Sequence, residues 1–279
     1  MAASRPTPEA GVFDISTGTA ELVHSIDGGW LLSVNGAQSS HIDPDRPDAL
    51  DFEYMRQAAA AIADHYPDAA TPLRMLHLGA AACALPRHLA HRYPQSRHVA
   101  VEIDAELARL AREWFDLPRA PRLRIRVGDA REVTEGLREQ TRDVVMRDAF
   151  SASLTPTHLT TVEFTRAVQR LLVPGGLYIA NCGDRRDLAS VRSEVSTIAD
   201  VFANVELISD PSMFKGRRSG NIIVVAGDGP LPDSPALERV LRADPEPSRL
   251  MTGRDATAFG SGRIRRDESD HVVQAVDDR

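Results

Sequence analysis

Short apolar runs alternate with longer segments of helical spacing through the middle of the chain. Runs of a few apolar residues favour buried strands, whereas apolar residues that recur every three or four positions favour helices. From residue 74 onward this alternation repeats five times, which predicts an α/β fold with a Rossmann-like, doubly wound, mostly parallel sheet covered by helices on both faces. The five predicted strands are 75–78, 98–103, 123–127, 143–146 and 177–181.

Strand patterns also occur on both sides of this region. Residues 204–208 and 221–226 are joined by a connection too short for a crossover helix, which predicts a C-terminal antiparallel hairpin at the sheet edge. Residues 19–26 and 30–34 flank an Asp-Gly-Gly turn signal and indicate a small N-terminal β module. We therefore expect a disordered segment 1–10, the module with its linking helix over 11–66, the Rossmann-like domain over 67–228, and a C-terminal helix with a mobile tail over 229–279.

The first predicted core strand ends at Gly79, in a turn that opens a helix. In nucleotide-binding βαβ units this turn uses several glycines, which let the backbone approach a ligand closely. The residues that follow Gly79 are Ala80, Ala81, Ala82, Cys83 and Ala84. An alanine held at positive φ is penalised by about 1 kcal/mol. The stretch predicts either a nucleotide-binding unit or a buried crossover that binds no ligand.

Four acidic residues follow predicted strands at their carboxyl ends, where open α/β sheets bind ligands. Glu102 and Asp104 end the second strand, and Glu102 lies at the distance from the turn glycine that suits a carboxylate bound to ribose hydroxyls. Asp129, after the third strand, suits the exocyclic amine of a purine, and Asp148, after the fourth, faces the reacting end. Alternatively, these acids only cap the helices that follow them.

Composition narrows the choice of partners. The formal charge of −7 and the pI near 5.7 argue against nucleic acid or an anionic membrane and are compatible with a cationic small-molecule substrate. Cys83 and Cys182 have neither zinc-site nor disulfide-framework spacing, so no metal is expected. Because no apolar run has the length of a membrane span and the N-terminus lacks a hydrophobic signal core, we predict a cytoplasmic protein.

Seven short motifs between residues 19 and 226 form an ordered set. They are Gly36-Ala37-Gln38, Phe52-Glu53-Tyr54, His77-Leu78-Gly79, Val101-Glu102-Ile103-Asp104, Val127-Gly128-Asp129-Ala130, Asp143-Val144-Val145 followed by Asp148, and Pro174-Gly175-Gly176. Each motif is short, but their order is fairly specific. The set resembles the spermidine synthase family of polyamine aminopropyltransferases, within the class I S-adenosylmethionine-dependent transferases.

The resemblance implies an aminopropyl transfer to an amine, in a pocket between the β module and the Rossmann-like domain. Glu102 would hold the donor's ribose, and Asp129 with Ala130 its adenine. Gln38 and Tyr54 would line the substrate side, unless Tyr54 only packs on its helix and Gln38 is only an exposed strand residue. The co-substrate, decarboxylated S-adenosylmethionine or S-adenosylmethionine, would contact Gly79, Ala80, Ala81, Glu102, Ile103, Asp129 and Ala130.

The resemblance also implies the chemistry and the assembly. Asp148 would be the catalytic base, because an ammonium has no lone pair until it loses a proton, and the reaction requires neither a metal nor a covalent intermediate. The protein would be a homodimer by analogy with the family.

Two positions depart from the family's pattern. Ala82 stands where the family loop has the acid that contacts the donor's amino group, so an Asp at Ala82 is expected to strengthen binding of the decarboxylated donor. Ser151 stands where the family has a second acid after the fourth strand, so putrescine is expected to be a poor acceptor, and a monoamine or larger amine to compete well. A methyltransferase and a noncatalytic nucleoside-binding or scaffold homologue are the alternatives.

Overall fold

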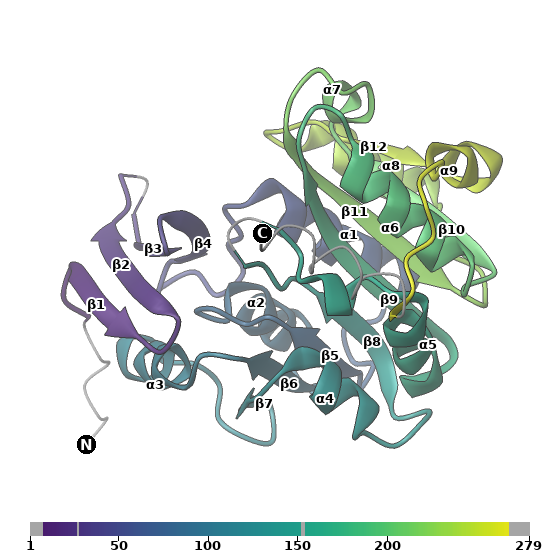
Figure 1. Ribbon diagram of the computed structural model, residues 1–279. Coiled ribbons are helices and arrows are strands. Elements are labelled where there is room, and N and C mark those ends of the chain that lie inside the picture. The colour runs from purple at the N-terminus through teal and green to yellow at the C-terminus, as the bar shows by residue number, and fades with distance from the viewer. Residues whose placement is uncertain (1–7, 27, 152–153, 268–279) are drawn as a thin grey trace.

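The computed structural model describes residues 8–26, 28–151 and 154–267 and arranges them around two sheets (Figure 1). The small sheet is antiparallel in the order β1-β2-β3-β4 and forms the predicted N-terminal module. Ala20 and Leu22 of β2 are buried and alternate with exposed neighbours, because only one face of this sheet is covered. The strands are β1 (Gly11–Ile15), β2 (Gly18–His24), β3 (Trp30–Val34) and β4 (Ala37–Ile42). Most of the segment predicted to be disordered, residues 1–7, lies outside the described residues.

The large sheet has eight strands in the order β12-β10-β11-β9-β8-β5-β6-β7. The five strands from β5 to β9 pair in parallel, whereas β11 pairs antiparallel with both β9 and β10. This arrangement confirms the predicted doubly wound, mostly parallel sheet with an antiparallel C-terminal pair. The strands are β5 (Arg74–Leu78), β6 (Arg97–Glu102), β7 (Leu123–Val127), β8 (Arg142–Arg147), β9 (Leu172–Asp184), β10 (Asn204–Ser209), β11 (Gly220–Gly227) and β12 (Arg249–Met251).

Helices cover both faces of the large sheet, because alternate residues of its strands are apolar in both directions. Met75 of β5 joins the hydrophobic cluster beneath α1, α2, α3 and α8, whereas Leu76 and Leu78 join the cluster beneath α4, α5, α6 and α9. The helices are α1 (Glu53–His65), α2 (Ala84–Arg92), α3 (Ala105–Trp114), α4 (Ala130–Glu135), α5 (Val162–Leu171), α6 (Ala189–Ala199), α7 (Pro211–Phe214), α8 (Pro235–Ala243) and α9 (Gly253–Phe259). Within the described residues, none of them has the length and apolar character needed to cross a bilayer.

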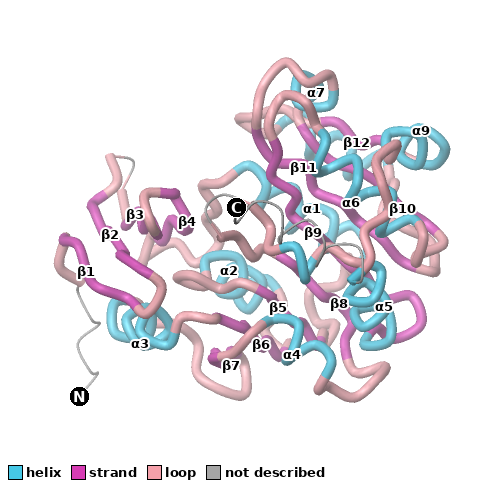
Figure 2. The backbone as a smooth tube through the Cα atoms, in the orientation of Figure 1, coloured by secondary structure: helices cyan, strands magenta, loops and turns pink. Residues whose placement is uncertain are grey.

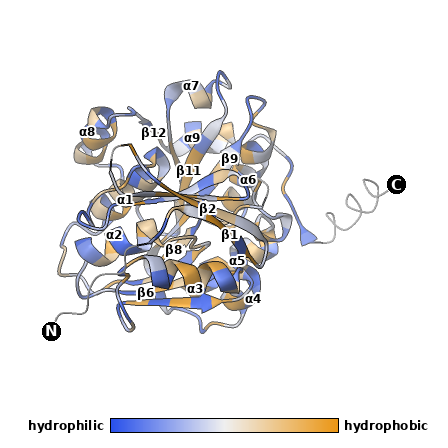
Figure 3. Ribbon diagram, turned by 90° about the vertical axis from the view of Figure 1, so that its left-hand side faces the viewer, coloured by the Kyte–Doolittle hydropathy of each residue, from blue (hydrophilic) through white to orange (hydrophobic). Residues whose placement is uncertain are grey.

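The strand order reverses at β5, which pairs with β6 on one side and β8 on the other. The carboxyl ends of these strands therefore open a crevice at the switch point. Loops gather between these ends and the small sheet (Figure 2), and the small sheet lies across the front of the larger unit in Figure 3. The fold thus brings the N-terminal module to the edge of the sheet where the acids were predicted.

The secondary structure differs from the sequence-based expectation in three places. The antiparallel pair β10 and β11 is not the edge of the sheet, since β12 pairs outside β10 and is too short to show a strand period. Residues 156–172, whose sequence pattern favours a single helix, divide into a short 3-10 turn, Thr157–Leu159, and α5, whose first turn is capped by the Thr161 hydroxyl. Helix α4 was missed because its six residues carry no helical repeat.

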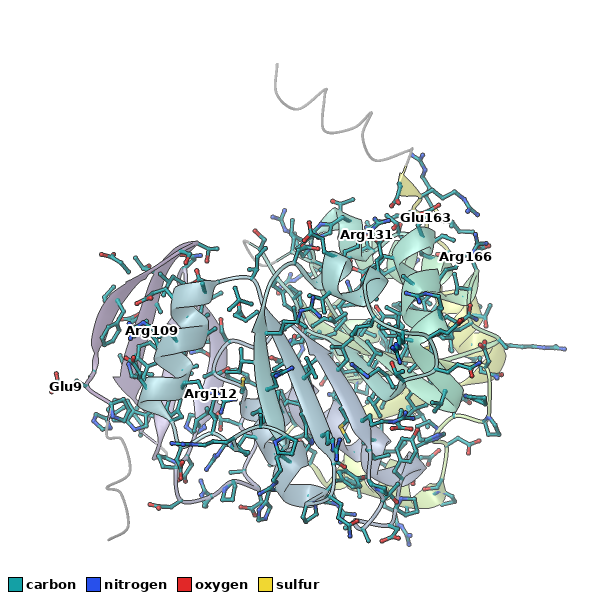
Figure 4. All side chains as sticks on the ribbon, turned by 90° about the horizontal axis from the view of Figure 1, so that it is seen from below. Glu9, Arg109, Arg112, Arg131, Glu163 and Arg166 are labelled. Atoms are coloured by element: carbon teal, nitrogen blue, oxygen red, sulfur yellow. The ribbon has the colours of Figure 1, made fainter. Side chains whose placement is uncertain are left out.

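The last described residues, 261–267, are held against the large unit, although they were expected to belong to a mobile tail. The backbone N–H of Arg265 donates to the Thr197 hydroxyl at 3.0 Å, and its guanidinium donates to Thr160 Oγ1 at 3.1 Å. Asp267 accepts two hydrogen bonds from the Arg131 guanidinium at the start of α4, and its N–H donates to Glu163. Figure 4 shows Arg131 and Glu163 at this end of the molecule. The rest of the predicted tail, 268–279, lies outside the described residues.

Candidate active site

Gly79 sits at the tip of β5, where only glycine fits. Its φ is +90°, and a Cβ added there would overlap the carbonyl oxygen of Asp148 at the end of β8. The Asp148 N–H donates to the Leu78 carbonyl at 2.7 Å, so the two strand ends are joined by backbone. The missing side chain of Gly79 therefore lets Asp148 approach the turn.

A substitution pair tests this close approach. Gly79→Ala should lower the free energy of unfolding by more than about 2 kcal/mol, because the new Cβ adds a backbone overlap to the roughly 1–2 kcal/mol cost of positive φ. Gly175→Ala is the matched control, since Gly175 also has positive φ, +77°, but nothing lies within 4 Å of an added Cβ. Its cost should stay near 1 kcal/mol in urea titrations. Equal losses in the two variants would contradict the assignment.

The alanine-rich turn adopts backbone conformations that are energetically unfavourable for residues other than glycine. Ala81 has a φ of +42° and Cys83 a φ of +61°, both in the left-handed region that glycine adopts without penalty. Ala82, between them, is fully buried, is not among the residues that line the cavity described below, and its N–H donates to the Ser40 hydroxyl. The expectation that an Asp at Ala82 would strengthen donor binding is therefore wrong, because its carboxylate would enter an apolar core.

Glu102 closes the turn from the end of β6. One of its carboxylate oxygens accepts hydrogen bonds from the N–H groups of Ala80 and Ala81, at 3.2 and 2.9 Å, and the other accepts from the Asp104 N–H. Asp104 itself caps α3 and accepts from the backbone and hydroxyl of Thr17 in the small sheet. Asp104 thus fixes the two sheets together, and Glu102 is the acid of this pair that faces the crevice.

Asp129 both caps a helix and faces the crevice. Oδ1 accepts from the N–H groups of Arg131 and Glu132, and Oδ2 lies 3.0 Å from His158 Nε2. Burial raises the pKa of Asp129, but these hydrogen bonds outweigh it and hold the pKa below the usual range. Asp129 is therefore a carboxylate at neutral pH, with both oxygens already partly engaged.

Asp148 is held by two side chains from different elements. Tyr54, on α1, donates its hydroxyl hydrogen to Oδ2 at 2.9 Å, and Asn181, on β9, donates to Oδ1 at 2.8 Å. Burial raises the pKa of Asp148, partly opposed by these two hydrogen bonds and by the nearby charge of Arg147. A fixed carboxylate with an elevated pKa is suited to accept a proton.

These residues border one cavity of about 670 Å³. It is lined by the ten residues that the resemblance implied as donor-binding, substrate-lining or catalytic, so residues from both sheets and from α1 meet there, whereas Asp104 and Ala82 do not line it. The ten are Gln38, Tyr54, Gly79, Ala80, Ala81, Glu102, Ile103, Asp129, Ala130 and Asp148. Ile103, Phe150 and Leu154 also face the cavity with much of their apolar surface exposed, at 62, 39 and 52%. The cavity therefore combines carboxylates with apolar surface suited to a flat ring.

The cavity residues that sequence reasoning missed include Asn181, His158 and Arg185. Asn181 could have been found, because it is a polar residue near the carboxyl end of a predicted strand, like the acids that were identified. His158 lies in a short 3-10 turn that no periodic pattern marks, and Arg185 follows the end of β9 in a loop. Only the fold brings the last two to the crevice.

Comparison with known proteins gives a consistent picture, although no family model matches the chain. A polyamine aminopropyltransferase of Vibrio vulnificus (strain CMCP6) is 29% identical over 194 residues, which are 69% of this chain and 61% of that protein. The chain thus spans about three fifths of that relative's length. A spermidine synthase solved in complex with the transition state analogue AdoDATO is 16% identical, with a TM-score of 0.59 over 90% of this chain and 83% of that one, which shows a shared fold.

A crystal structure of a probable spermidine synthase from Corynebacterium glutamicum ATCC 13032 is much more similar. Its TM-score is 0.89 and its sequence identity 45%, with 94% of this chain and 97% of that chain covered. The motifs that carried the resemblance lie along the cavity, at the switch point of the sheet. On this evidence the chain belongs to the spermidine synthase family.

Proposed function

We propose that this protein transfers the aminopropyl group of decarboxylated S-adenosylmethionine to a small-molecule amine. The observation that carries the proposal is the position of Asp148, a carboxylate with an elevated pKa that Tyr54 and Asn181 hold on the cavity wall. Family membership and the aminopropyltransferase names of similar proteins support the same reaction.

The nucleoside end of the donor is assigned to the carboxyl ends of β6 and β7. Glu102 is positioned to accept hydrogen bonds from ribose hydroxyls, and Asp129 from a purine amino group. The exposed side chain of Ile103 offers an apolar surface for the ring. Gly79, Ala80, Ala81 and Ala130 would contact the donor mainly through backbone and small side chains, which leaves room for close approach.

The reaction needs a base more than it needs leaving-group activation. The amine nitrogen forms a bond to the aminopropyl carbon next to sulfur, the carbon–sulfur bond breaks, and methylthioadenosine leaves as a neutral thioether. Asp148 accepts the proton that the attacking nitrogen loses. The hydrogen bonds from Tyr54 and Asn181 fix the carboxylate, and Tyr54 with Gln38 lines the acceptor side of the cavity.

Calorimetric titration with methylthioadenosine, decarboxylated S-adenosylmethionine and S-adenosylmethionine, followed by a turnover assay with amines, tests the proposal. Binding of the first two and release of methylthioadenosine with an amine would support it. Turnover of S-adenosylmethionine with release of S-adenosylhomocysteine would favour the methyltransferase alternative. Binding without turnover of either donor would favour a noncatalytic homologue, and no binding of any of the three would overturn all three functions.

Removing the charge of Glu102 should weaken nucleoside binding specifically. Glu102→Gln keeps the shape of the side chain but loses charge-assisted hydrogen bonds to ribose, so the Kd for methylthioadenosine should rise about 10- to 100-fold. Glu106→Gln is the matched control, because Glu106 lies half-buried on α3, pairs with Arg109 and does not line the cavity. An unchanged Kd in Glu102→Gln, measured by calorimetry, would remove Glu102 from the nucleoside site.

The oligomeric state, the cellular location and the partners are also proposals. We expect a cytoplasmic homodimer that binds neither nucleic acid nor a membrane surface, in line with the net charge of −7. Light scattering coupled to size-exclusion chromatography would measure the assembly.

A further inference from the structure

We propose that the acceptor is an amine that carries an anionic group at its far end, and that Arg185 binds this anion. The inference rests on the proposed aminopropyl transfer and names its acceptor class. It begins from the last residues of β9, which form one wall of the cavity beside Asp148.

Asn181 and Gly183 alternate on β9, so they share one side of the strand, and Arg185 follows the end of the strand at Asp184. These residues and Asp184 line the cavity, whereas Cys182 is buried in the core on the opposite face. Asn181 is hydrogen-bonded to Asp148, which places the base at the inner end of this row. Because Asn181 is buried and Arg185 is exposed, the row runs from the base outward.

The middle of the row is apolar. An added Cβ on Gly183 would come within 3.2 Å of the Phe150 ring, so this ring packs directly against the strand between Asn181 and Arg185. Phe150 lines the cavity and is 39% exposed. A short chain of methylene groups that extends from the base toward Arg185 would cover this surface.

The outer end of the row is a cation with no partner among the described residues. The Arg185 guanidinium makes no hydrogen bond or ion pair there, whereas its backbone N–H donates to Asp184 and its carbonyl accepts from the Leu188 N–H. The neighbouring loop that carries α7, residues 210–218, adds Lys215 and Arg217, whereas its Arg218 is paired with Glu53 and its one acid, Asp210, caps α7. This loop touches residue 186, because an added Cβ on Gly216 would overlap the Arg186 carbonyl oxygen. The outer end is therefore cationic in a protein of net charge −7.

The acid next to Arg185 in the chain, Asp184, is held by two backbone N–H groups. Asp184 lines the cavity, but one of its oxygens accepts from the Arg185 N–H at 2.7 Å and the other from the Val191 N–H at 2.8 Å. Ser151, which also lines the cavity, is uncharged. A diamine would thus place its second positive charge beside Arg185, whereas a carboxylate or phosphonate would form a charge-assisted pair with it.

Four amines that differ in the charge of their far end test which charge the acceptor site prefers. Putrescine, butylamine and 4-aminobutyrate share a four-carbon chain and end in a cation, a methyl group and a carboxylate, and 3-aminopropylphosphonate replaces the carboxylate by a phosphonate. With decarboxylated S-adenosylmethionine as donor, kcat/KM for 4-aminobutyrate or the phosphonate should exceed that for putrescine by at least about tenfold. The better of the two anionic amines identifies the anion.

Variants of Arg185 test the contact itself. Arg185→Gln should lower kcat/KM for the anionic amines about 10- to 100-fold, mainly through KM, and leave butylamine unchanged. Arg185→Glu should reverse the preference toward putrescine. Arg166→Gln is the matched control, because Arg166 is exposed on the outer side of α5 (Figure 4), makes no ion pair among the described residues and does not line the cavity.

The outcomes separate the two proposals. Preference of the wild-type protein for putrescine, or equal use of all four amines, would overturn the acceptor class and keep the aminopropyl transfer. Calorimetry with methylthioadenosine-loaded protein measures acceptor binding without turnover. Arg185-dependent binding of an anionic amine with no turnover of any amine would overturn the aminopropyl transfer alone. The absence of both this binding and turnover would overturn the transfer and the acceptor class.

Discussion

Replacing Asp148 by Asn is expected to lower turnover by about 10²- to 10⁴-fold and to leave the affinity for methylthioadenosine nearly unchanged. The amide keeps the shape of the side chain and its contacts with Tyr54 and Asn181 in part, but it accepts no proton. Steady-state kinetics with the best amine, together with calorimetry on the same variant, measures the two effects separately.

The control is Asp116→Asn, an exposed Asp that does not line the cavity. It should match the wild-type protein in both measurements. Undiminished turnover by Asp148→Asn would rule out Asp148 as the base.

The pH dependence gives a second measure of the same residue. Because burial raises the pKa of Asp148 and the reaction uses its carboxylate, kcat should fall as the pH falls through that raised pKa. Tyr54→Phe removes a hydrogen bond that lowers this pKa, so the acidic limb should move to higher pH.

The folded protein binds a proton at Asp148 more readily than the unfolded chain, so stability is lost as the pH rises through the folded pKa. Asp148→Asn should then be no less stable than the wild-type protein above that pKa.

Glu194→Gln is expected to lower the free energy of unfolding by about 3–5 kcal/mol, the largest effect on stability that we predict. Arg147 and Glu194 form an ion pair whose side chains are only 1 and 2% exposed. Arg147 also donates to Cys182 Sγ at 3.3 Å, and Arg265 approaches Glu194 to 3.9 Å. Loss of the Glu194 charge leaves the buried guanidinium uncompensated, and urea denaturation measures the cost.

A surface pair provides the control. Arg242 and Glu238 are paired on α8 with side chains 68 and 53% exposed, so Glu238→Gln should cost less than about 0.5 kcal/mol. The double variant Arg147→Met with Glu194→Leu should cost much less than Glu194→Gln, because no unpaired charge is left. Similar small losses in Glu194→Gln and Glu238→Gln would contradict the prediction.

The periodic part of the fold could be predicted from the sequence. The strands β5, β8 and β9 carry apolar residues on both faces, and this pattern distinguishes a parallel sheet buried between helices from a half-exposed one. Elements that depend on tertiary contacts could not be predicted. β12 has three residues and becomes a strand only because it pairs with β10, and α4 depends on the Asp129 cap more than on any repeat.

The residues of the candidate site also fall into those that the sequence predicts and those that only the fold brings together. Glu102, Asp129 and Asp148 could be found because the carboxyl ends of parallel strands meet at one edge. Tyr54 was found only through the family resemblance, since it reaches Asp148 from 94 residues away. His158, which contacts Asp129, and Arg185 could not be found, because one lies in a short 3-10 turn and the other in a loop. Ala82 shows the limit of aligning a motif, because its position in the loop is retained while its side chain is buried in the core instead of lining the cavity.

The segment that ends at Asp267 contacts the part of the cavity wall that is proposed to bind the purine. Asp267 accepts hydrogen bonds from Arg131, two residues after Asp129, and Arg265 donates to Thr160 at the end of the turn that carries His158. A ligand that orders Asp129 and His158 is expected to favour docking of this segment, and docking is expected to favour the ligand to the same extent. A change that detaches residues 261–267 is therefore expected to weaken binding of the proposed nucleoside.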